Sequence, residues 1–150
     1  MRKIGIMGGT FDPIHIGHLI AAEQARDQCG LDEVWFVPTN APPHKNAPPG
    51  ASADHRLEMV RLAIAAFPPF QLSDLEIRRG GVSYTIDTVE RLTADFPDAH
   101  FAYIIGADMV EYLPKWHRIE EIAAKITFIG LARPGYSLGA ELPDWLRRRV

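Results

Sequence analysis

Residues 3–18 contain a short apolar run, then a glycine turn, and then the start of a second run that is helix-like. The first run, Lys3 to Met7, is partly β-branched and ends at Gly8, which is typical of a buried strand in a parallel sheet. The second run begins near Ile16 and carries apolar residues at near-helical spacing. A strand that passes through a glycine turn into a helix predicts the start of a β-α-β unit.

The turn itself carries the residue types of a phosphate site. Gly8 and Gly9 let a ligand approach the backbone closely, and His15 and His18 lie three residues apart at the start of the predicted helix, where they share a face. Free N–H groups and the positive end of the helix dipole attract phosphate, and imidazole donors add to that attraction. The alternative is that the two histidines only cap the helix.

The rest of the chain alternates between strand-like and helix-like segments. Strands are expected at 3–7, 33–38, 70–77, 100–105 and 125–131, and helices at 16–29, 52–67, 83–96, 107–113 and 119–124. Gly30 is expected to end the first helix, and Ser52 or Asp54 to cap the second. This alternation predicts one α/β domain over residues 1–150, a Rossmann-like open parallel sheet of about five strands flanked by helices.

Charge and composition exclude several classes of protein. A net charge of −3, from 16 Lys and Arg against 19 Asp and Glu, predicts no nucleic-acid partner and no acidic membrane surface. No apolar stretch approaches the roughly 20 residues of a membrane helix, and no signal peptide follows Met1. The single Cys29 excludes an intramolecular disulfide and a thiolate metal cluster. These features predict a soluble cytoplasmic protein, and a homodimer is compatible with them.

Ligands of an open parallel sheet bind beyond the carboxyl ends of its strands. The loops expected at that edge are 8–18, 38–45, 78–85, 106–117 and 132–135, and they hold most of the reactive and glycine-rich segments of the chain. Their convergence favours a functional interpretation of His15 and His18 over helix capping alone.

The spacing Gly9-x-Phe11-x-Pro13-x-His15-x-Gly17-His18 resembles the signature of the HIGH-type nucleotidylyltransferases. Further segments, in order along the chain, resemble the nicotinate-nucleotide adenylyltransferase family within that superfamily. They are Pro38 to Lys45, Ser83-Tyr84-Thr85 with Asp87-Thr88, Gly106-Ala107-Asp108, Pro114-Lys115-Trp116 and Ala132-Arg133-Pro134-Gly135. The resemblance runs from residue 3 to about residue 135.

The resemblance implies adenylyl transfer from ATP to nicotinate mononucleotide, giving nicotinate adenine dinucleotide and pyrophosphate in NAD biosynthesis. It implies Mg²⁺ carried by the nucleotide phosphates, with no metal site of the protein itself, and it gives His15 and His18 the catalytic role. The ATP-binding residues that it implies are Gly8, Gly9, Thr10, Phe11, His15, His18, Gly106 and Asp108. The mononucleotide-binding residues that it implies are His44, Lys45, Thr85 and Trp116.

Several of these residues also have a simpler interpretation. Lys45 would otherwise be a solvated surface lysine, and Trp116 a rigid turn residue packed on a helix. Asp12 is either a metal neighbour or a side chain that stabilises its turn. Trp35 and Trp145 are interpreted as packing residues.

The C-terminal segment departs from the family pattern. Family members carry Ser-Ser-Thr followed by Arg, at the start of a helix that binds the ATP phosphates, and no Ser-Ser-Thr occurs here. The domain is therefore expected to be C-terminally incomplete relative to the family, and Arg147 to Arg149 are interpreted as an exposed helix end. The alternatives are another HIGH-type transferase, one that uses nicotinamide mononucleotide for example, and a non-catalytic nucleotide-binding module.

Overall fold

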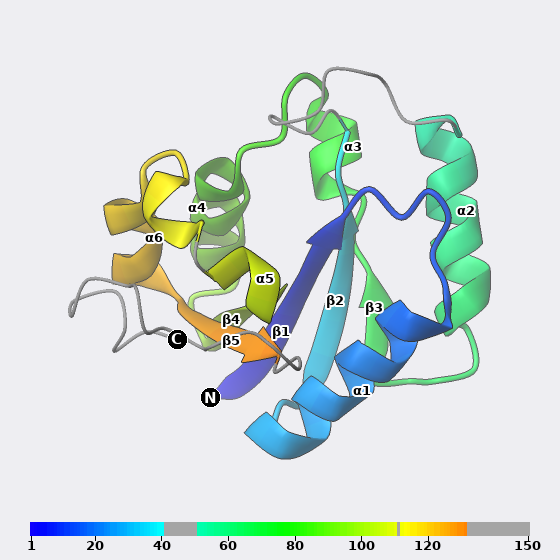
Figure 1. The fold of residues 1–150 in the computed structure, drawn as a ribbon, viewed down its shortest axis with the longest axis horizontal. Coiled ribbons are helices and arrows are strands. Elements are labelled where there is room, and N and C mark those ends of the chain that lie inside the picture. The colour runs from blue at the N-terminus through cyan, green and yellow to red at the C-terminus, as the bar shows by residue number, and fades with distance from the viewer. Residues whose placement is uncertain (41–50, 111, 132–150) are drawn as a thin grey trace.

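A five-stranded, fully parallel sheet forms the centre of the computed structural model, which describes residues 1–40, 51–110 and 112–131 (Figure 1). The strand order is β3-β2-β1-β4-β5, and each neighbouring pair runs parallel. The strands are β1 (Arg2–Gly9), β2 (Glu33–Pro38), β3 (Phe70–Leu72), β4 (Ala99–Gly106) and β5 (Thr127–Leu131). The predicted open parallel sheet is therefore confirmed.

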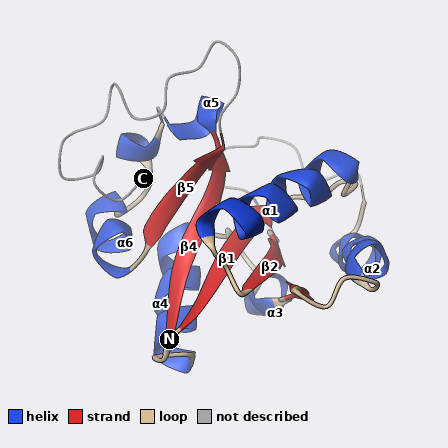
Figure 2. Ribbon diagram, turned by 90° about the horizontal axis from the view of Figure 1, so that it is seen from below, coloured by secondary structure: helices blue, strands red, loops and turns tan. Residues whose placement is uncertain are grey.

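Helices cover both faces of this sheet (Figure 2). They are α1 (Ile16–Cys29), α2 (Ala53–Ile64), α3 (Leu75–Arg79), α4 (Thr85–Asp95), α5 (Ala107–Val110) and α6 (Ile119–Lys125), with a 3₁₀ turn at Leu113–Lys115. Buried residues of α1 and α2 pack on one face, whereas those of α4 and α6 pack on the other. None of the helices in the described ranges is long and apolar enough to cross a membrane.

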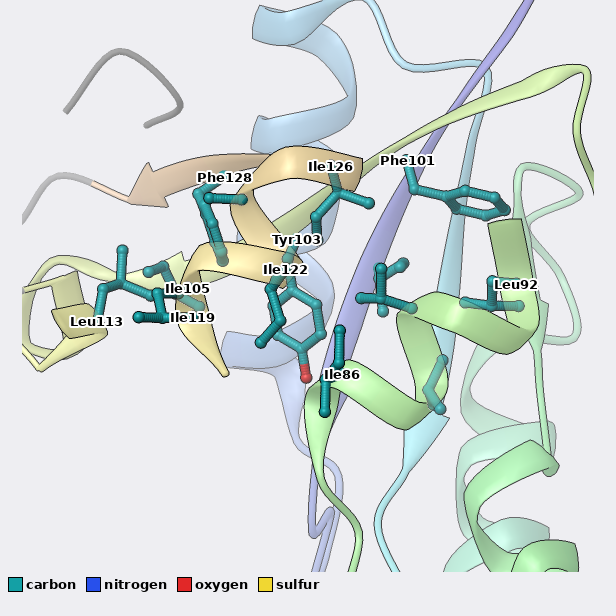
Figure 3. Close-up of a cluster of buried hydrophobic side chains, with 14 of the residues drawn as sticks. Ile86, Leu92, Phe101, Tyr103, Ile105, Leu113, Ile119, Ile122, Ile126 and Phe128 are labelled. Atoms are coloured by element: carbon teal, nitrogen blue, oxygen red, sulfur yellow. The ribbon is translucent and has the colours of Figure 1, made fainter. Parts of the chain in front are cut away.

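The alternation of side chains along β4 builds both hydrophobic cores. Phe101, Tyr103 and Ile105 face α4 and α6, as Figure 3 shows, whereas Ile104 faces the core under α1 and α2. Because successive strand residues point to opposite faces, a central strand with both faces covered must be apolar at nearly every position. The uninterrupted apolar run from Phe101 to Ile105 in β4 is the result.

Two of the predicted helix boundaries follow their local signals. Gly30 adopts the left-handed conformation (φ 64°) that commonly ends a helix, directly after Cys29. Ser52 caps α2, since its hydroxyl accepts a hydrogen bond from the backbone N–H of His55 at 3.2 Å.

The strand predicted at 70–77 is wrong in its second half. Only Phe70–Leu72 pairs with β2, and Leu75–Arg79 forms the short helix α3. Leu75 and Glu76 are adjacent and both buried, which an alternating strand with one solvent face does not allow. An ion pair from Arg78 to Asp74, four residues apart, supports the helical turn.

Candidate active site

A cavity of about 770 Å³ opens where β1 and β4 reach their carboxyl ends. The strand order reverses at this point, because the chain runs from β1 to β2 and β3 on one side and to β4 and β5 on the other. Ligands of open α/β sheets bind at such a point. The predicted site residues that line the cavity are Gly8, Gly9, Thr10, His15, His18, Thr85, Gly106 and Trp116.

His15 and His18 form one unit at the start of α1. The backbone N–H of His15, the N-cap residue, donates to Nδ1 of His18 at 3.0 Å. The two rings stack with their centroids 3.8 Å apart and their planes 28° apart. Because Nδ1 of His18 accepts this bond, the proton of the neutral ring lies on Nε2. His18 therefore offers Nε2–H as a hydrogen-bond donor.

The surroundings of His18 favour its neutral form. Burial lowers its pKa from the usual 6.5 because the charged ring loses water, and the neighbouring His15 lowers the pKa further because two imidazolium ions would repel each other. His18 is thus neutral at pH 7 and donates without a net charge.

Phe11 supports His18 from the core. Its side chain is 3% exposed and lies outside the lining of the cavity. The ring of Phe11 meets the His18 ring edge-on, with centroids 5.0 Å apart, and also contacts Phe36. Its φ of 51° is uncommon for a residue with a side chain and places the turn in a sparsely populated conformation. The ATP-binding role of Phe11 stays a prediction, whereas its contact with His18 is a feature of the structure.

Gly8 has a structural reason to be glycine that the sequence did not reveal. A Cβ at this position would lie 2.1 Å from the hydroxyl oxygen of Tyr103 on β4. Figure 3 shows this hydroxyl beside Ile86, near the start of α4. At Gly9 a Cβ would only reach ordinary contact with the ring of Phe11, at 3.6 Å. Gly8 thus makes room for another part of the cavity wall.

Thr85 and Trp116 line the same cavity from more distant segments. Thr85 is the first residue of α4, and Trp116 follows the 3₁₀ turn. The Trp116 ring packs edge-on against Tyr103 at 5.7 Å and against Phe128 at 5.9 Å. Trp116 therefore packs against side chains of β4 and β5, rather than on a helix as its simpler interpretation predicts, and it also lines the cavity.

Glu76 is a cavity-lining residue that the sequence interpretation missed. It is 3% exposed, and its Oε2 accepts a hydrogen bond from the Thr88 hydroxyl at 2.6 Å. Nη2 of Arg79 in turn donates to the Thr88 hydroxyl at 3.3 Å. Burial raises the pKa of Glu76, while the Thr88 hydrogen bond and the charge of Arg79 act in the opposite direction. No sequence signal marked it, since Glu76 fell within the predicted strand.

The remaining predicted residues are placed as follows. His44, Lys45, Trp145 and Arg147 to Arg149 lie outside the described residues, and Asp108 is placed only as a position in α5. Asp12 accepts a hydrogen bond from the backbone N–H of Ala51 at 3.0 Å, which links its turn to the segment before α2. Trp35 packs against Phe96 and Phe101, as expected.

The side chains at the cavity bear on how a metal ion could be held. Within the ranges that the structure describes, His, Cys, Asp and Glu side chains form no group of three or more that could hold a metal ion. The polar groups that the described residues place at the cavity are imidazoles, hydroxyls, backbone amides and a single carboxylate, that of Glu76, whose Oε2 already accepts a hydrogen bond from Thr88. Mg²⁺ prefers several carboxylate or phosphate oxygens. These residues suit the binding of phosphate oxygens, which can themselves carry the ion.

Known proteins are similar to this chain in sequence. The cytidylyltransferase-like family profile matches residues 6–147. The probable nicotinate-nucleotide adenylyltransferase of Oceanobacillus iheyensis is 57% identical over 143 residues, which cover 95% of this chain and 74% of that protein. The nicotinate-nucleotide adenylyltransferase of Bacillus subtilis is 49% identical over 143 residues, which cover 95% of this chain and 76% of that protein.

A solved structure extends the agreement in fold. The nicotinic acid mononucleotide adenylyltransferase of Plasmodium falciparum, complexed with NaAD, aligns with a TM-score of 0.77 at 21% identity. The alignment covers 92% of this chain and 68% of that chain. The α/β architecture is therefore shared well beyond the range of close sequence similarity.

Proposed function

This chain belongs to the nicotinate-nucleotide adenylyltransferase family, and we propose that it transfers the adenylyl group of ATP to nicotinate mononucleotide in NAD biosynthesis. The products are nicotinate adenine dinucleotide and pyrophosphate. The observation that carries the proposal is one cavity lined both by the His15–His18 unit and by Trp116 with Thr85. The first pair suits the phosphates of ATP, and the second suits a pyridine ring with a carboxylate.

The reaction needs no nucleophile from the protein. A phosphate oxygen of the mononucleotide attacks the α-phosphorus of ATP and forms a new P–O bond. The bond between the α-phosphorus and the oxygen that bridges it to the β-phosphorus breaks. The electron pair leaves with pyrophosphate. Such an in-line transfer depends on holding the two phosphates in position and on stabilising the charge that develops between them.

His18 supplies a donor for that charge in this proposal. Its Nε2–H remains available because Nδ1 is occupied by the backbone N–H of His15. The N-terminus of α1 adds free backbone N–H groups and the positive end of its dipole. The Phe11 ring beside His18 holds the imidazole in place.

The mononucleotide half of the proposal rests on the tryptophan side of the cavity. A positively charged pyridine ring stacks favourably on indole, and Trp116 is fixed by Tyr103 and Phe128. The hydroxyl of Thr85 and the N-terminus of α4 are suitable donors for the carboxylate of nicotinate. An amide in place of that carboxylate would gain less from these donors.

Mg²⁺ enters the proposal as part of the MgATP substrate, where it would neutralise phosphate charge. The proposed compartment is the cytoplasm, since Cys29 is a free, exposed thiol of the kind that reducing compartments retain.

The direct test measures pyrophosphate release and dinucleotide formation with MgATP and either nicotinate mononucleotide or its amide. Faster turnover of the acid is expected. ATP binding without turnover of either mononucleotide would contradict the proposed activity and favour a nucleotide-binding module. Equal turnover of both would contradict the acid preference alone.

A further inference from the structure

Arg56 of α2 is the largest fully buried side chain in the described part of the chain, with 2% of its surface exposed. A buried guanidinium is expensive unless its donors are used, because the charged group has lost its water. Arg56 does not line the cavity, and no motif in the sequence singled it out. Its position therefore calls for a physical explanation.

Among the residues that the structure describes, Arg56 donates four hydrogen bonds to backbone carbonyl groups in segments around the cavity. Nη1 donates to the carbonyl oxygen of Thr10 at 3.0 Å and to that of Thr39 at 2.6 Å. Nε donates to the carbonyl of Ala51 at 3.3 Å, and Nη2 lies 3.5 Å from the carbonyl of Asn40. One side chain thus joins the turn after β1, the residues after β2 and the start of α2.

These carbonyls belong to residues at the cavity. Thr10 and Thr39 both line it, and Thr10 lies between the glycine pair and the His15–His18 unit. A peptide group is planar, so a carbonyl fixed towards Arg56 also fixes the direction of the N–H that follows it. The backbone N–H of Asn40, which follows the fixed carbonyl of Thr39, donates to the Ser83 hydroxyl at 3.0 Å. Arg56 therefore orients peptide groups at two places on the cavity wall.

A second contact ties the same region together. Asp12 accepts a hydrogen bond from the N–H of Ala51, while Arg56 binds the carbonyl of Ala51. The N–H of Ala51 thus binds the turn after β1, and its carbonyl binds Arg56, so both backbone groups of this residue before α2 are held. A lysine could not reproduce this arrangement, because its single ammonium lacks the planar fork of five N–H donors.

We propose that Arg56 is a positioning residue for the triphosphate of ATP, acting through the carbonyl groups of Thr10 and Thr39. A carbonyl oxygen that turned towards the ligand would repel phosphate, and Arg56 holds the Thr10 carbonyl away from it. The inference rests on the proposed function, because the proposed function assigns ATP to the side of the cavity formed by Gly8–Thr10, His15 and His18. Arg56 itself does not touch the substrate.

The test replaces Arg56 by lysine and by glutamine and varies each substrate at saturating concentrations of the other. Arg56→Lys is expected to lower kcat/KM for ATP by about a hundredfold, the typical result of misplacing a reacting group by about 1 Å. The KM for nicotinate mononucleotide is expected to change little. Thermal unfolding and ATP binding by calorimetry accompany the kinetics for every variant.

Arg61 on the same helix provides the matched control. Its side chain is 57% exposed and pairs with Glu58, so Arg61→Lys and Arg61→Gln change the same chemistry at the surface. Both controls are expected to keep the wild-type kinetics and affinity for ATP.

Three outcomes would overturn the proposal. The first is a folded Arg56 variant with unchanged kcat/KM for ATP, and the second is an equal rise in KM for both substrates that follows the fall in melting temperature. The third is failure of both Arg56 variants to fold, which would make Arg56 a residue of the fold alone. A wild-type protein that turns over neither mononucleotide would contradict the proposed function instead, and ATP affinity would still test Arg56.

Discussion

The cavity has two groups of lining residues that are built in different ways. The histidine group, Gly8–Thr10 with His15 and His18, comes from eleven consecutive residues and depends on backbone geometry at one turn. The tryptophan group, Glu76, Thr85 and Trp116, comes from three separate segments and is held by side-chain contacts with Thr88, Tyr103 and Phe128. A local motif can thus specify one half of a site, whereas the other half exists only after the sheet has formed.

The histidine group is tested most severely by His18→Ala. Removing a donor that meets developing charge is expected to lower kcat by about a hundredfold, or about 3 kcal/mol of transition-state stabilisation. His55→Ala is the control, because His55 is exposed on α2. Steady-state kinetics with MgATP and nicotinate mononucleotide measures the effect. A near-normal kcat for His18→Ala would remove this residue from the mechanism.

The two groups meet where Gly8 faces Tyr103. Gly8→Ala would place a Cβ 2.1 Å from the Tyr103 hydroxyl, which is expected to destabilise the protein by about 3 kcal/mol, the upper end of the range for overpacking. The double variant Gly8→Ala/Tyr103→Phe removes the clashing oxygen and should regain part of the loss, although the ring carbon at 3.0 Å stays close. Urea unfolding of both single variants and the double variant gives the coupling. Additive effects would show that the clash is relieved elsewhere.

The tryptophan group is tested by two substitutions of Glu76. Glu76→Ala leaves the buried Thr88 hydroxyl without its acceptor and is expected to cost about 1–2 kcal/mol of stability. Glu76→Gln keeps an acceptor oxygen and should cost less. Thermal unfolding compares the two variants, and a larger loss for Gln than for Ala would contradict the assigned hydrogen bond.

The raised pKa of Glu76 also predicts how the stability of the protein changes with pH. Because burial raises the pKa of Glu76 above 4.5, the folded protein holds this proton to higher pH than the unfolded chain does. The contribution of Glu76 to stability is therefore complete below pH 4.5 and is lost as the pH rises through the folded-state pKa. Because Glu76→Gln cannot ionise, the difference in stability between this variant and the wild type should shift in favour of the variant as the pH rises from 4.5 through the folded-state pKa. The exposed Glu58→Gln is the control and should show no such shift.

The contrast between the groups also explains what could be predicted from the sequence. The sheet, α1 and the histidine group follow from local signals, such as the apolar run of β4, the left-handed Gly30 and the three-residue spacing of His15 and His18. Placement of Thr85 and Trp116 at one cavity followed from the rule that strand ends meet at one edge.

What the sequence could not predict depends on contacts between distant segments. Glu76 was assigned to a strand because its neighbours alternate in polarity, whereas its burial depends on Thr88, twelve residues away. Arg56 has the local pattern of an ordinary helix arginine, and only the folded chain brings the carbonyls of Thr10 and Thr39 to it. The sequence pattern predicts that Gly8 makes room for a ligand, whereas the atom nearest to a Cβ placed at Gly8 is the hydroxyl oxygen of Tyr103.

The smallest effect that we expect is a change in the pKa of His18 in the variant His15→Ala. His15→Ala removes the ring that lowers the pKa of His18 by charge but keeps the backbone N–H that donates to Nδ1. The pKa of His18 should therefore rise, because the variant removes the charge effect of His15 and also exposes the face of the ring that His15 covers. It should stay below 6.5, because the contacts with the rest of the protein still bury the ring.

Titration of the imidazole protons by NMR measures this change in the wild-type protein and in His15→Ala. A pKa above 6.5 in the wild-type protein would contradict the lowering by burial and by His15, and with it the assignment of Nδ1 as the acceptor for the backbone N–H of His15. A pKa that does not move in His15→Ala would mean that the stacked ring exerts no charge effect, and that burial alone keeps His18 neutral. A modest rise would instead show that residue 15 acts on His18 in two ways, because its backbone N–H sets the tautomer of His18 while its side chain adds to burial in keeping the ring neutral.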